Sequence, residues 1–328
     1  MSKIYLAITI DTECDKGKGW KVKQPLSFTN TQKGIVNNLQ PILDKYSAKA
    51  TYLLSPEVLL DQESVRVLKS MQQKVELGAH LHAEFIEPEA NYKSDTTNSY
   101  QKDFSAQVER EKLINLTQLF KDKIGYSPTS FRAGRFGISH SSLSILEELG
   151  YLVDSSVTPD LFWKNNNLLG NSVNFYGAPY QPYYPSNSDF RMRGDMNILQ
   201  VPVSVMNYKL LKLPDWIKRK ITLKSRYHQI TFSYLTNFSK ASWLRPTFSS
   251  VEEMQVFTNK CLEMNQDKDI SLCMMFHSNE FEVGTSPYSL TNEALQKSST
   301  RLDGYLSWLS KSFDCKFVGL TEFKEHVK

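Results

Sequence analysis

Residues 4–13, IYLAITIDTE, predict the central element of the fold. Residues 4–10 are almost all apolar or β-branched, which is typical of a strand buried on both faces of a sheet. Strands of this kind occur in parallel sheets, because helices cover both faces of such a sheet. The apolar run ends at Asp11 and Glu13. We therefore expect a central parallel strand that carries two acidic side chains at its carboxyl end.

Beyond this strand, strand-like and helix-like segments alternate. Further strands are expected at residues 50–54, 75–82, 131–137, 152–155, 198–203, 272–276 and 317–319, and helices at residues 34–45, 64–73, 107–120, 141–149, 251–263 and 294–309. This alternation favours a parallel sheet or a βα barrel. Residues 158–249 break the pattern, because they are rich in Asn, Tyr, Pro and Trp and hold one clear strand. We predict a single barrel domain over residues 1–328, with an insertion at residues 158–249.

The composition is that of an ordinary globular protein. Apolar residues make up 40% of the 328 residues, which excludes disorder over most of the chain. The 39 basic and 35 acidic residues leave a net charge of +4, which is too balanced for a dedicated nucleic-acid binder. The four cysteines are scattered and form no C-x-x-C pair, so neither a zinc knuckle nor a disulfide framework is indicated.

The sequence also bears on cellular location. No segment approaches the roughly 18 apolar residues of a membrane-spanning helix. The first residues lack the small-residue cleavage site of a secretory signal. We therefore expect a cytoplasmic protein, and the sequence leaves its oligomeric state open.

Metal-binding side chains gather where two predicted strands end. Asp11 and Glu13 end the first strand, and His80 and His82 end the strand at residues 75–82. Side chains at positions i and i+2 of a strand point the same way, so each pair can face one pocket. Two imidazoles and a carboxylate suit zinc or a similar divalent metal and leave a position open for water. The alternative is that these histidines are structural core residues.

Five short motifs in order resemble the polysaccharide deacetylase superfamily, carbohydrate esterase family 4. They are Thr9-Ile10-Asp11-Thr12-Glu13, Gly78-Ala79-His80-Leu81-His82-Ala83-Glu84, Phe131-Arg132-Ala133-Gly134-Arg135-Phe136-Gly137, Asp154-Ser155-Ser156-Val157 and Met275-Phe276-His277-Ser278-Asn279. The resemblance covers residues 4–279 apart from the insertion. It implies a distorted (β/α)7 TIM-like barrel.

The resemblance also implies roles for the motif residues. Glu13, His80 and His82 would bind one divalent metal, with zinc as the first expectation and cobalt or nickel as alternatives. Asp11 would be the general base, and His277 the general acid that protonates the departing amine.

Other motif residues would support the reaction. Arg132 and Asp154 would form an ion pair that orients Asp11 and keeps it ionised, or alternatively an ion pair with no catalytic duty. Three further side chains would bind sugar hydroxyls or serve as ordinary loop residues: Arg135, Asn279 and Glu280.

The motifs depart from the family pattern at four places. Thr12 stands where the family has its metal-binding Asp, and Glu84 where the second metal-binding His falls. The third motif lacks its proline and the fourth its tryptophan. The chain is therefore similar to a divergent branch, the deacetylase-like proteins of surface-polysaccharide gene clusters. Two questions stay open: whether Asp11 or Glu13 is the metal ligand, and whether Glu84 joins the site.

The implied function is metal-dependent removal of an N-acetyl or similar N-acyl group from an amino sugar, nucleotide-linked or lipid-linked. Such a reaction belongs to the biosynthesis of cell-surface polysaccharide, lipopolysaccharide or glycolipid. Alternatively, the barrel binds carbohydrate without a metal, or hydrolyses a non-sugar C–N amide bond. A glycosidase with Asp11 and Glu13 as its carboxylate pair is a further alternative, but it gives the histidines no task.

Residues 207–226 form a basic segment within the insertion. Seven Lys and Arg side chains stand there against one acidic residue, Asp215, and they alternate with apolar residues that include Trp216. A basic amphipathic segment can lie on an anionic membrane surface. We expect peripheral contact with the inner membrane face, or alternatively packing on the barrel or on another subunit.

Overall fold

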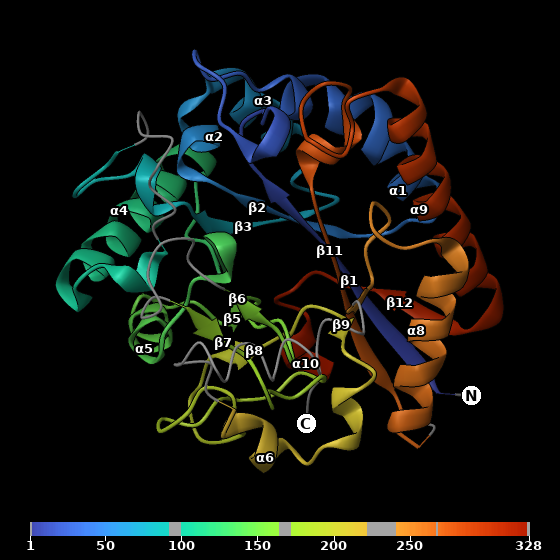
Figure 1. The fold of residues 1–328 in the computed structure, drawn as a ribbon. Helices are drawn as coiled ribbons and strands as arrows, with labels where there is room; N and C mark the ends of the chain where they lie inside the picture. Colours follow the sequence, from blue (N-terminus) through green and yellow to red (C-terminus); the bar gives the residue numbers. More distant parts are fainter. Residues whose placement is uncertain (1, 92–99, 164–171, 222–240, 267, 327–328) are drawn as a thin grey trace.

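A curved parallel sheet forms the centre of the molecule (Figure 1). The structure is a computed structural model that describes residues 2–91, 100–163, 172–221, 241–266 and 268–326. Seven strands follow one another across the sheet in the order β11 (Ile270–His277), β1 (Lys3–Thr12), β2 (Ala50–Leu54), β3 (Glu76–Leu81), β4 (Ser130–Ala133), β5 (Val153–Asp154) and β8 (Leu199–Gln200). The strand β12 (Asp314–Phe317) pairs with the first half of β1. The predicted distorted (β/α)7 barrel is confirmed.

Strand β1 is buried on both faces, as its sequence predicts. Ile4, Leu6, Ile8 and Ile10 point outward into the main core beneath the helices. Ala7 points inward, where it packs with apolar side chains of the other strands. Because side chains alternate along a strand, the inward set continues through Thr9 and Asp11 toward the carboxyl end.

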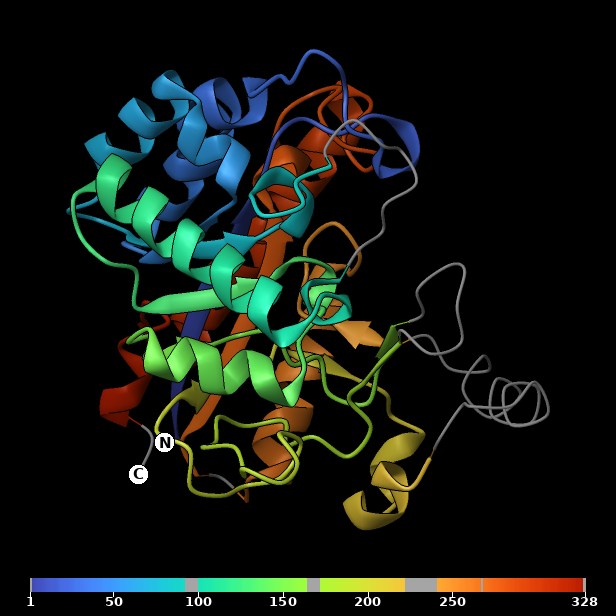
Figure 2. The ribbon, with the colours of Figure 1, turned by 90° about the vertical axis from the view of Figure 1, so that its left-hand side faces the viewer.

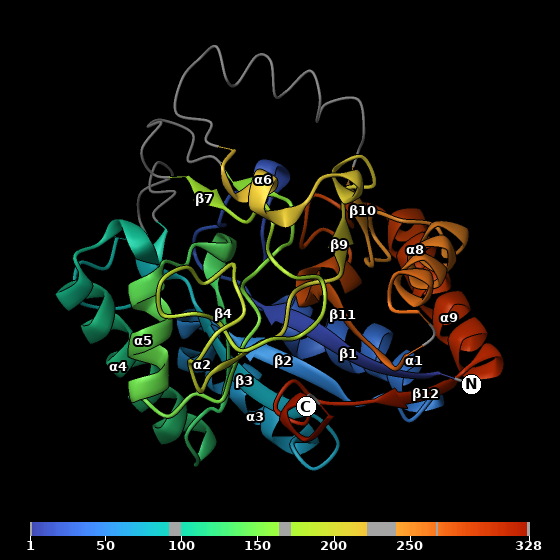
Figure 3. The ribbon, with the colours of Figure 1, turned by 90° about the horizontal axis from the view of Figure 1, so that it is seen from below.

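Helices surround the sheet on its outer side (Figures 1 and 3). They are α1 (Gln40–Lys45), α2 (Pro56–Leu60), α3 (Gln62–Met71), α4 (Ala106–Ile124), α5 (His140–Glu148), α8 (Val251–Met264), α9 (Asn292–Ser312) and α10 (Phe323–His326). The helix expected at residues 34–45 differs from the prediction, because its first part is a π-helix, η2 (Asn30–Leu39). Pro41 follows at once, and a proline cannot continue the ladder of backbone hydrogen bonds.

Polar contacts close the barrel on the outer edge of β11. The side-chain amide of Gln181 donates to the carbonyl of Ser271 and accepts from its N–H, as a neighbouring strand would. Ser204 does the same for Cys273, with its backbone N–H as donor and its hydroxyl as acceptor. Residues of the insertion therefore bridge the gap between β11 and β8, the two strands at the ends of the sheet.

The insertion adds two small antiparallel ribbons and short helices. Its elements outside the main sheet are β6 (Phe162–Trp163), β7 (Val173–Asn174), β9 (Val205–Met206), η6 (Leu210–Lys212), α6 (Asp215–Arg219) and β10 (Ser242–Trp243). Pairing joins β6 to β7 and β9 to β10. Helix α6 lies at the periphery, away from the centre of the sheet (Figure 2). Within the described residues, every helix is too short or too polar to cross a membrane.

Candidate active site

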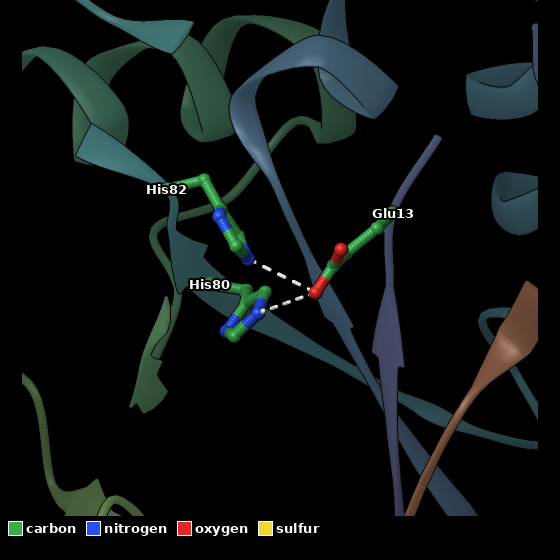
Figure 4. Close-up of side chains that lie close together, drawn as sticks. All are labelled: Glu13, His80 and His82. Atoms are coloured by element: carbon green, nitrogen blue, oxygen red, sulfur yellow. Dashed lines mark hydrogen bonds and ion pairs between the residues drawn. The ribbon is translucent and has the colours of Figure 1, made fainter. Parts of the chain in front are cut away.

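Glu13, His80 and His82 meet at the carboxyl end of the sheet (Figure 4). Glu13 directly follows β1, His80 lies in β3, and His82 follows β3. Oε1 of Glu13 lies 3.3 Å from Nε2 of His80 and 2.9 Å from Nε2 of His82. All three side chains are buried. The i, i+2 spacing therefore brings together the three residues that the sequence predicts as metal ligands.

The hydrogen bonds of the two imidazoles suit a bound cation. Nδ1 of His80 lies 2.9 Å from the carbonyl oxygen of Arg132, which only accepts. Nδ1 of His82 lies 3.3 Å from a carboxylate oxygen of Glu84. Each Nδ1 therefore carries a proton, and in the neutral ring Nε2 keeps a lone pair. Two lone pairs and a carboxylate oxygen then converge on one point, a donor set that fits a divalent metal.

Local charges favour the ionised forms of Glu13 and His82. Burial raises the pKa of Glu13, but His82 and Lys16 outweigh it and hold that pKa well below its usual range. Lys16, itself buried, lies 3.1 Å from Oε2 of Glu13. Burial alone lowers the pKa of His82, but Glu13 and Glu84 raise it to about 9. Without a metal, a proton on His82 therefore supplies positive charge between the two carboxylates.

Asp11 lies beside Glu13, His80 and His82 and forms an ion pair with Arg132. Nη1 of Arg132 donates to Oδ1 of Asp11 at 2.7 Å, and both side chains are buried. Oδ2 of Asp11 lies 3.9 Å from Nε2 of His80 and 4.0 Å from Nε2 of His277. Burial raises the pKa of Asp11, but the Arg132 guanidinium and the imidazoles outweigh it and lower that pKa. Asp11 therefore presents one ionised oxygen toward the two rings.

The predicted ion pair between Arg132 and Asp154 does not form. The other donors of Arg132 are taken up by Thr9 and Ser155. Asp154 instead accepts from the hydroxyl and the backbone N–H of Ser156, at 2.6 and 3.1 Å. It is fully buried and does not line the pocket. The expectation fails because Ser156, two residues after Asp154, satisfies this carboxylate locally.

His277 is fixed by a buried acid on its own loop. Nδ1 of His277 lies 2.8 Å from Oε1 of Glu280, which lies in the short helix η7 (Ser278–Phe281) that follows β11. Arg245 and Thr247, both from the insertion, donate to the oxygens of Glu280. Glu280 is therefore directed at His277 rather than at a substrate.

Asn279 also departs from its predicted place. It is fully buried beneath the loop, and its Nδ2 donates to the carbonyl of Cys14 at 3.4 Å. It does not line the pocket. Asn279 and Glu280 were expected to bind sugar hydroxyls, and the tight helical turn after His277 points both of them into the protein instead.

Glu84 joins the site as the partner of His82. It lies in the short helix η3 (Ala83–Phe85) and accepts from both terminal nitrogens of Arg135, at 2.6 and 3.2 Å. Buried Lys112 of α4 donates to the carbonyls on either side, those of Ala83 and Ile86, and so fixes this helix. The site thus contains two hydrogen-bonded chains of the form Arg–Glu–His. They are Arg135–Glu84–His82 and Arg245–Glu280–His277.

Comparisons with known proteins address the fold. No protein-family model and no curated protein matches the chain. The solved structure of a probable polysaccharide deacetylase from Pseudomonas aeruginosa PAO1 has a TM-score of 0.51 and 13% identity, over 99% of this chain and 90% of that one. The chain shares the fold of this deacetylase.

Proteins with other names share it too. The Puue allantoinase has a TM-score of 0.51 and 12% identity, over 99% of this chain and 89% of that one. A 4-alpha-glucanotransferase from Thermococcus litoralis has a TM-score of 0.52 and 13% identity, over 100% of this chain and 41% of that one. Because one barrel carries several named activities, the function has to be argued from the site.

A pocket of about 600 Å³ opens above the three predicted ligands. Its floor holds acidic and imidazole side chains, and its walls hold basic and aromatic ones. The lining residues are Asp11, Glu13, Lys16, Trp20, His80, His82, Tyr100, Arg135, Phe136, Trp163, Trp243, Arg245, Phe248, Met275, His277 and Tyr288. Six of the ten predicted site residues line it.

Sequence reasoning missed two basic residues of the pocket. Lys16 stands three positions after Glu13, in a loop that Asp15 fixes by accepting from the backbone N–H groups of Thr29 and Asn30. Arg245 lies in the insertion, 32 positions before His277. The proximity of Lys16 to a predicted ligand was an available signal, whereas only the fold brings Arg245 to the site.

Proposed function

We propose that this chain is a metal-dependent hydrolase that removes an acetyl or similar acyl group from the nitrogen of an amino sugar. The observation that carries the proposal is the buried group of Glu13, His80 and His82 beneath one pocket, with Asp11 and His277 beside it. The fold shared with a deacetylase and an allantoinase supports hydrolysis of a C–N bond there.

Glu13, His80 and His82 are the proposed ligands of one divalent cation. Zinc fits this donor set best, because imidazole and carboxylate are among its usual ligands and catalytic zinc sites use three of them. Cobalt and nickel accept similar ligands. A cation held there supplies Lewis-acid polarisation of the amide carbonyl and lowers the pKa of a water molecule. Lys16 engages Oε2 of Glu13 and leaves Oε1 for the cation.

Asp11 is the proposed general base. Arg132 holds one of its oxygens and favours its ionised form, so the carboxylate can accept a proton from the attacking water at neutral pH. Oδ2 of Asp11 lies 3.9 Å from Nε2 of His80, whereas Oε1 of Glu13 lies 3.3 Å from the same atom. The shorter distance favours Glu13 as the ligand and Asp11 as the base. A well-placed general base typically contributes a factor of about 10² to 10⁴ in rate.

His277 is the proposed general acid. Because Glu280 holds its Nδ1, the other ring nitrogen points toward Asp11 and Glu13, where the reacting amide would lie. Nε2 would give its proton to the departing amine. Glu280 is a positioning residue in this scheme, and Arg245 positions Glu280 in turn. Arg135, which lines the pocket, remains a proposed contact for the substrate.

The basic segment at residues 207–226 is the basis for a proposal on where in the cell the reaction takes place. Trp216 is 57% exposed on α6, and Lys220 next to it is exposed, so an apolar and basic surface is present. Lys218 of the predicted set is instead buried in ion pairs with Asp160 and Asp215. Residues 222–226 lie outside the described residues. We propose that this surface brings a cytoplasmic enzyme to a lipid-linked sugar at the inner membrane face.

Metal content and acetate release test the function. Protein purified without chelator should hold close to one equivalent of divalent metal, and a His80→Ala/His82→Ala variant should hold none. His140→Ala, at the start of α5 and outside the pocket, is the matched control and should keep the metal. The metal-loaded protein should release acetate from free, nucleotide-linked or lipid-linked N-acetyl amino sugars.

Other results point to the alternatives. Absence of metal after reconstitution with Zn²⁺, Co²⁺ or Ni²⁺ would contradict the proposal and favour a barrel that only binds carbohydrate. Turnover of non-sugar amides alone would favour the other kind of C–N hydrolase. His277→Ala should lose activity by a factor of about 10² or more while keeping its metal.

A further inference from the structure

Six aromatic side chains form a continuous wall around the pocket, which we call the aromatic collar. Each ring contacts the next, with centroid separations of 5.2 to 6.3 Å, and the last ring lies 4.8 Å from the ring of His277. In spatial order the members are Phe136, Trp163, Trp243, Phe248, Tyr288 and Trp20. All six line the pocket. The collar therefore runs from the loop after β4, around the site, to the proposed general acid.

The collar is assembled from distant parts of the chain. Phe136 follows β4, Trp20 follows β1, and Tyr288 follows β11. The insertion supplies the remaining three members, which are Trp163, Trp243 and Phe248. Half of the wall thus comes from the segment that interrupts the regular βα pattern.

Two collar members sit on an uncommon backbone. Trp20 has φ 63° and Phe136 has φ 56°, which is the left-handed region that side chains with a Cβ disfavour. Such conformations are energetically unfavourable and cluster at ligand-binding and active sites. A ring needed only for packing does not require this backbone. The two residues at the ends of the collar are therefore held toward the pocket at the expense of local stability.

Arg245 ties the collar to the proposed acid. Its guanidinium lies 4.1 Å from the ring centre of Phe248 and 5.5 Å from that of Tyr288. The same group donates to Glu280, the partner of His277. A ring that packs within the collar would therefore lie directly beside the acid that has to reach its amide nitrogen.

From these observations we infer that the collar binds a single pyranose ring, either a free or conjugated monosaccharide or the terminal residue of a chain. The apolar C–H face of a pyranose suits an aromatic wall, and its hydroxyls suit the polar floor. The pocket volume of about 600 Å³ is typical of a small-molecule site. An internal residue of a polysaccharide needs an open path on both sides, whereas a terminal residue needs only one, so a continuous wall of rings favours a terminal residue or a monosaccharide. The inference rests on the proposed function.

Ligand length tests the inference. Equilibrium binding to the metal-loaded protein would be measured with N-acetylglucosamine, N-acetylgalactosamine and N-acetylmannosamine, and with β-1,4-linked N-acetylglucosamine oligosaccharides of two to five residues. A one-ring site predicts dissociation constants that change less than about threefold with length. Mass spectrometry of the deacetylated oligosaccharides should then place every released acetyl group at a chain end.

Substitutions in the collar test whether its rings contact the sugar. Trp20→Ala and Trp163→Ala should each weaken binding about 3- to 10-fold, because an aromatic contact adds about 0.5–1.5 kcal/mol. Tyr126→Ala removes an aromatic side chain that is 43% exposed and lies outside the pocket, and it should leave affinity unchanged. Circular dichroism would verify that each variant is folded, and Trp20→Phe should restore most of the affinity.

Each further outcome has a distinct meaning. Affinity that rises tenfold or more from one residue to four, with internal residues deacetylated, would overturn the collar inference and leave the proposed function intact. Turnover of non-sugar amides without binding of any tested sugar would overturn both the sugar part of the proposed function and the inference. If Trp20→Ala and Trp163→Ala bind these sugars as tightly as the wild type does, the collar inference is overturned and the proposed function stands.

Discussion

At the scale of single residues, the contact between His277 and Glu280 carries a sharp prediction. Glu280→Gln keeps the size of the side chain but removes its charge. The imidazolium that has to form at His277 would lose its buried counter-ion, so kcat should fall about 10- to 100-fold, with little change in KM or metal content. Glu282→Gln, two positions later and outside the pocket, is the matched control. An unchanged kcat in Glu280→Gln would remove this positioning role.

Asp154 carries a prediction on pH. Full burial raises its pKa from 3.8 to about 6, although bonds from Ser156 and the charge of Arg132 oppose this. The folded state therefore binds this proton more tightly than the unfolded state. The resulting stability is fully present below about pH 4 and is lost as pH rises through 6.

Asp154→Asn cannot ionise and tests this directly. The free energy of unfolding of the wild type relative to the variant should fall by up to about 3 kcal/mol between pH 4 and pH 7. Urea unfolding over this pH range measures the difference. Because Asp154 touches Ser156 and not the pocket, kcat should stay within a few-fold of the wild type. The interpretation would be contradicted if the free energies of unfolding of the wild type and of Asp154→Asn changed with pH in parallel. A hundredfold loss of kcat in the variant would also contradict it.

The sequence could predict some of these residues and not others. Asp11, Glu13, His80 and His82 follow from strand periodicity alone, because alternate positions share a face. The partner of Arg132 could not be predicted in this way, since Asp154 accepts instead from Ser156, two residues further along the chain. The roles of Glu280 and Arg245 depend on a helical turn and on the path of a long insertion, and neither leaves a local pattern in the sequence.

At the scale of elements, the buried strands were the most predictable. Residues 50–54 form β2 as expected, and every one of its residues is buried. The expected strand at residues 131–137 is shorter, because β4 ends at Ala133 and a turn with two left-handed residues follows. Nothing in the sequence of Arg135 and Phe136 marks that conformation, which is one side chains rarely adopt.

Close packing of β3 gives a prediction at this scale. A Cβ at Gly78 would lie 2.3 Å from Oγ of Ser130 and 2.8 Å from a methyl group of Leu53, so Gly78→Ala forces β3 away from β2 and β4. We expect a loss of about 3 kcal/mol in the free energy of unfolding and weaker metal binding, because His80 lies on the same strand. Thermal unfolding and metal titration measure both effects.

Gly150→Ala is the matched comparison. This glycine ends α5 with φ 87° and has open space around its Cβ position, so the substitution strains only the backbone. Its expected cost is about 1 kcal/mol, with metal affinity unchanged. Equal effects of the two substitutions would show that packing of β3 does not position the ligands.

At the scale of the whole molecule, the site joins strands that are not neighbours in the sheet. Glu13 belongs to the end of β1, whereas His80 and His82 belong to β3, and β2 lies between them. The insertion closes the barrel through Gln181 and also supplies Arg245. Ligand binding at the centre is therefore expected to act on the stability of the entire barrel.

Metal-dependent stability tests this coupling. A ligand at 100 times its dissociation constant that binds only the folded state adds about 2.7 kcal/mol to the free energy of unfolding. For a domain of 328 residues, whose entropy of unfolding is about 0.7 kcal/mol/K, that raises the melting temperature by about 4 °C. Calorimetry of the chelated and zinc-loaded protein should show this rise, and His140→Ala should keep it. In His80→Ala/His82→Ala the two melting temperatures should coincide. A rise that survives in that variant would mean that the metal binds elsewhere, because the double substitution removes both imidazoles that converge on Glu13.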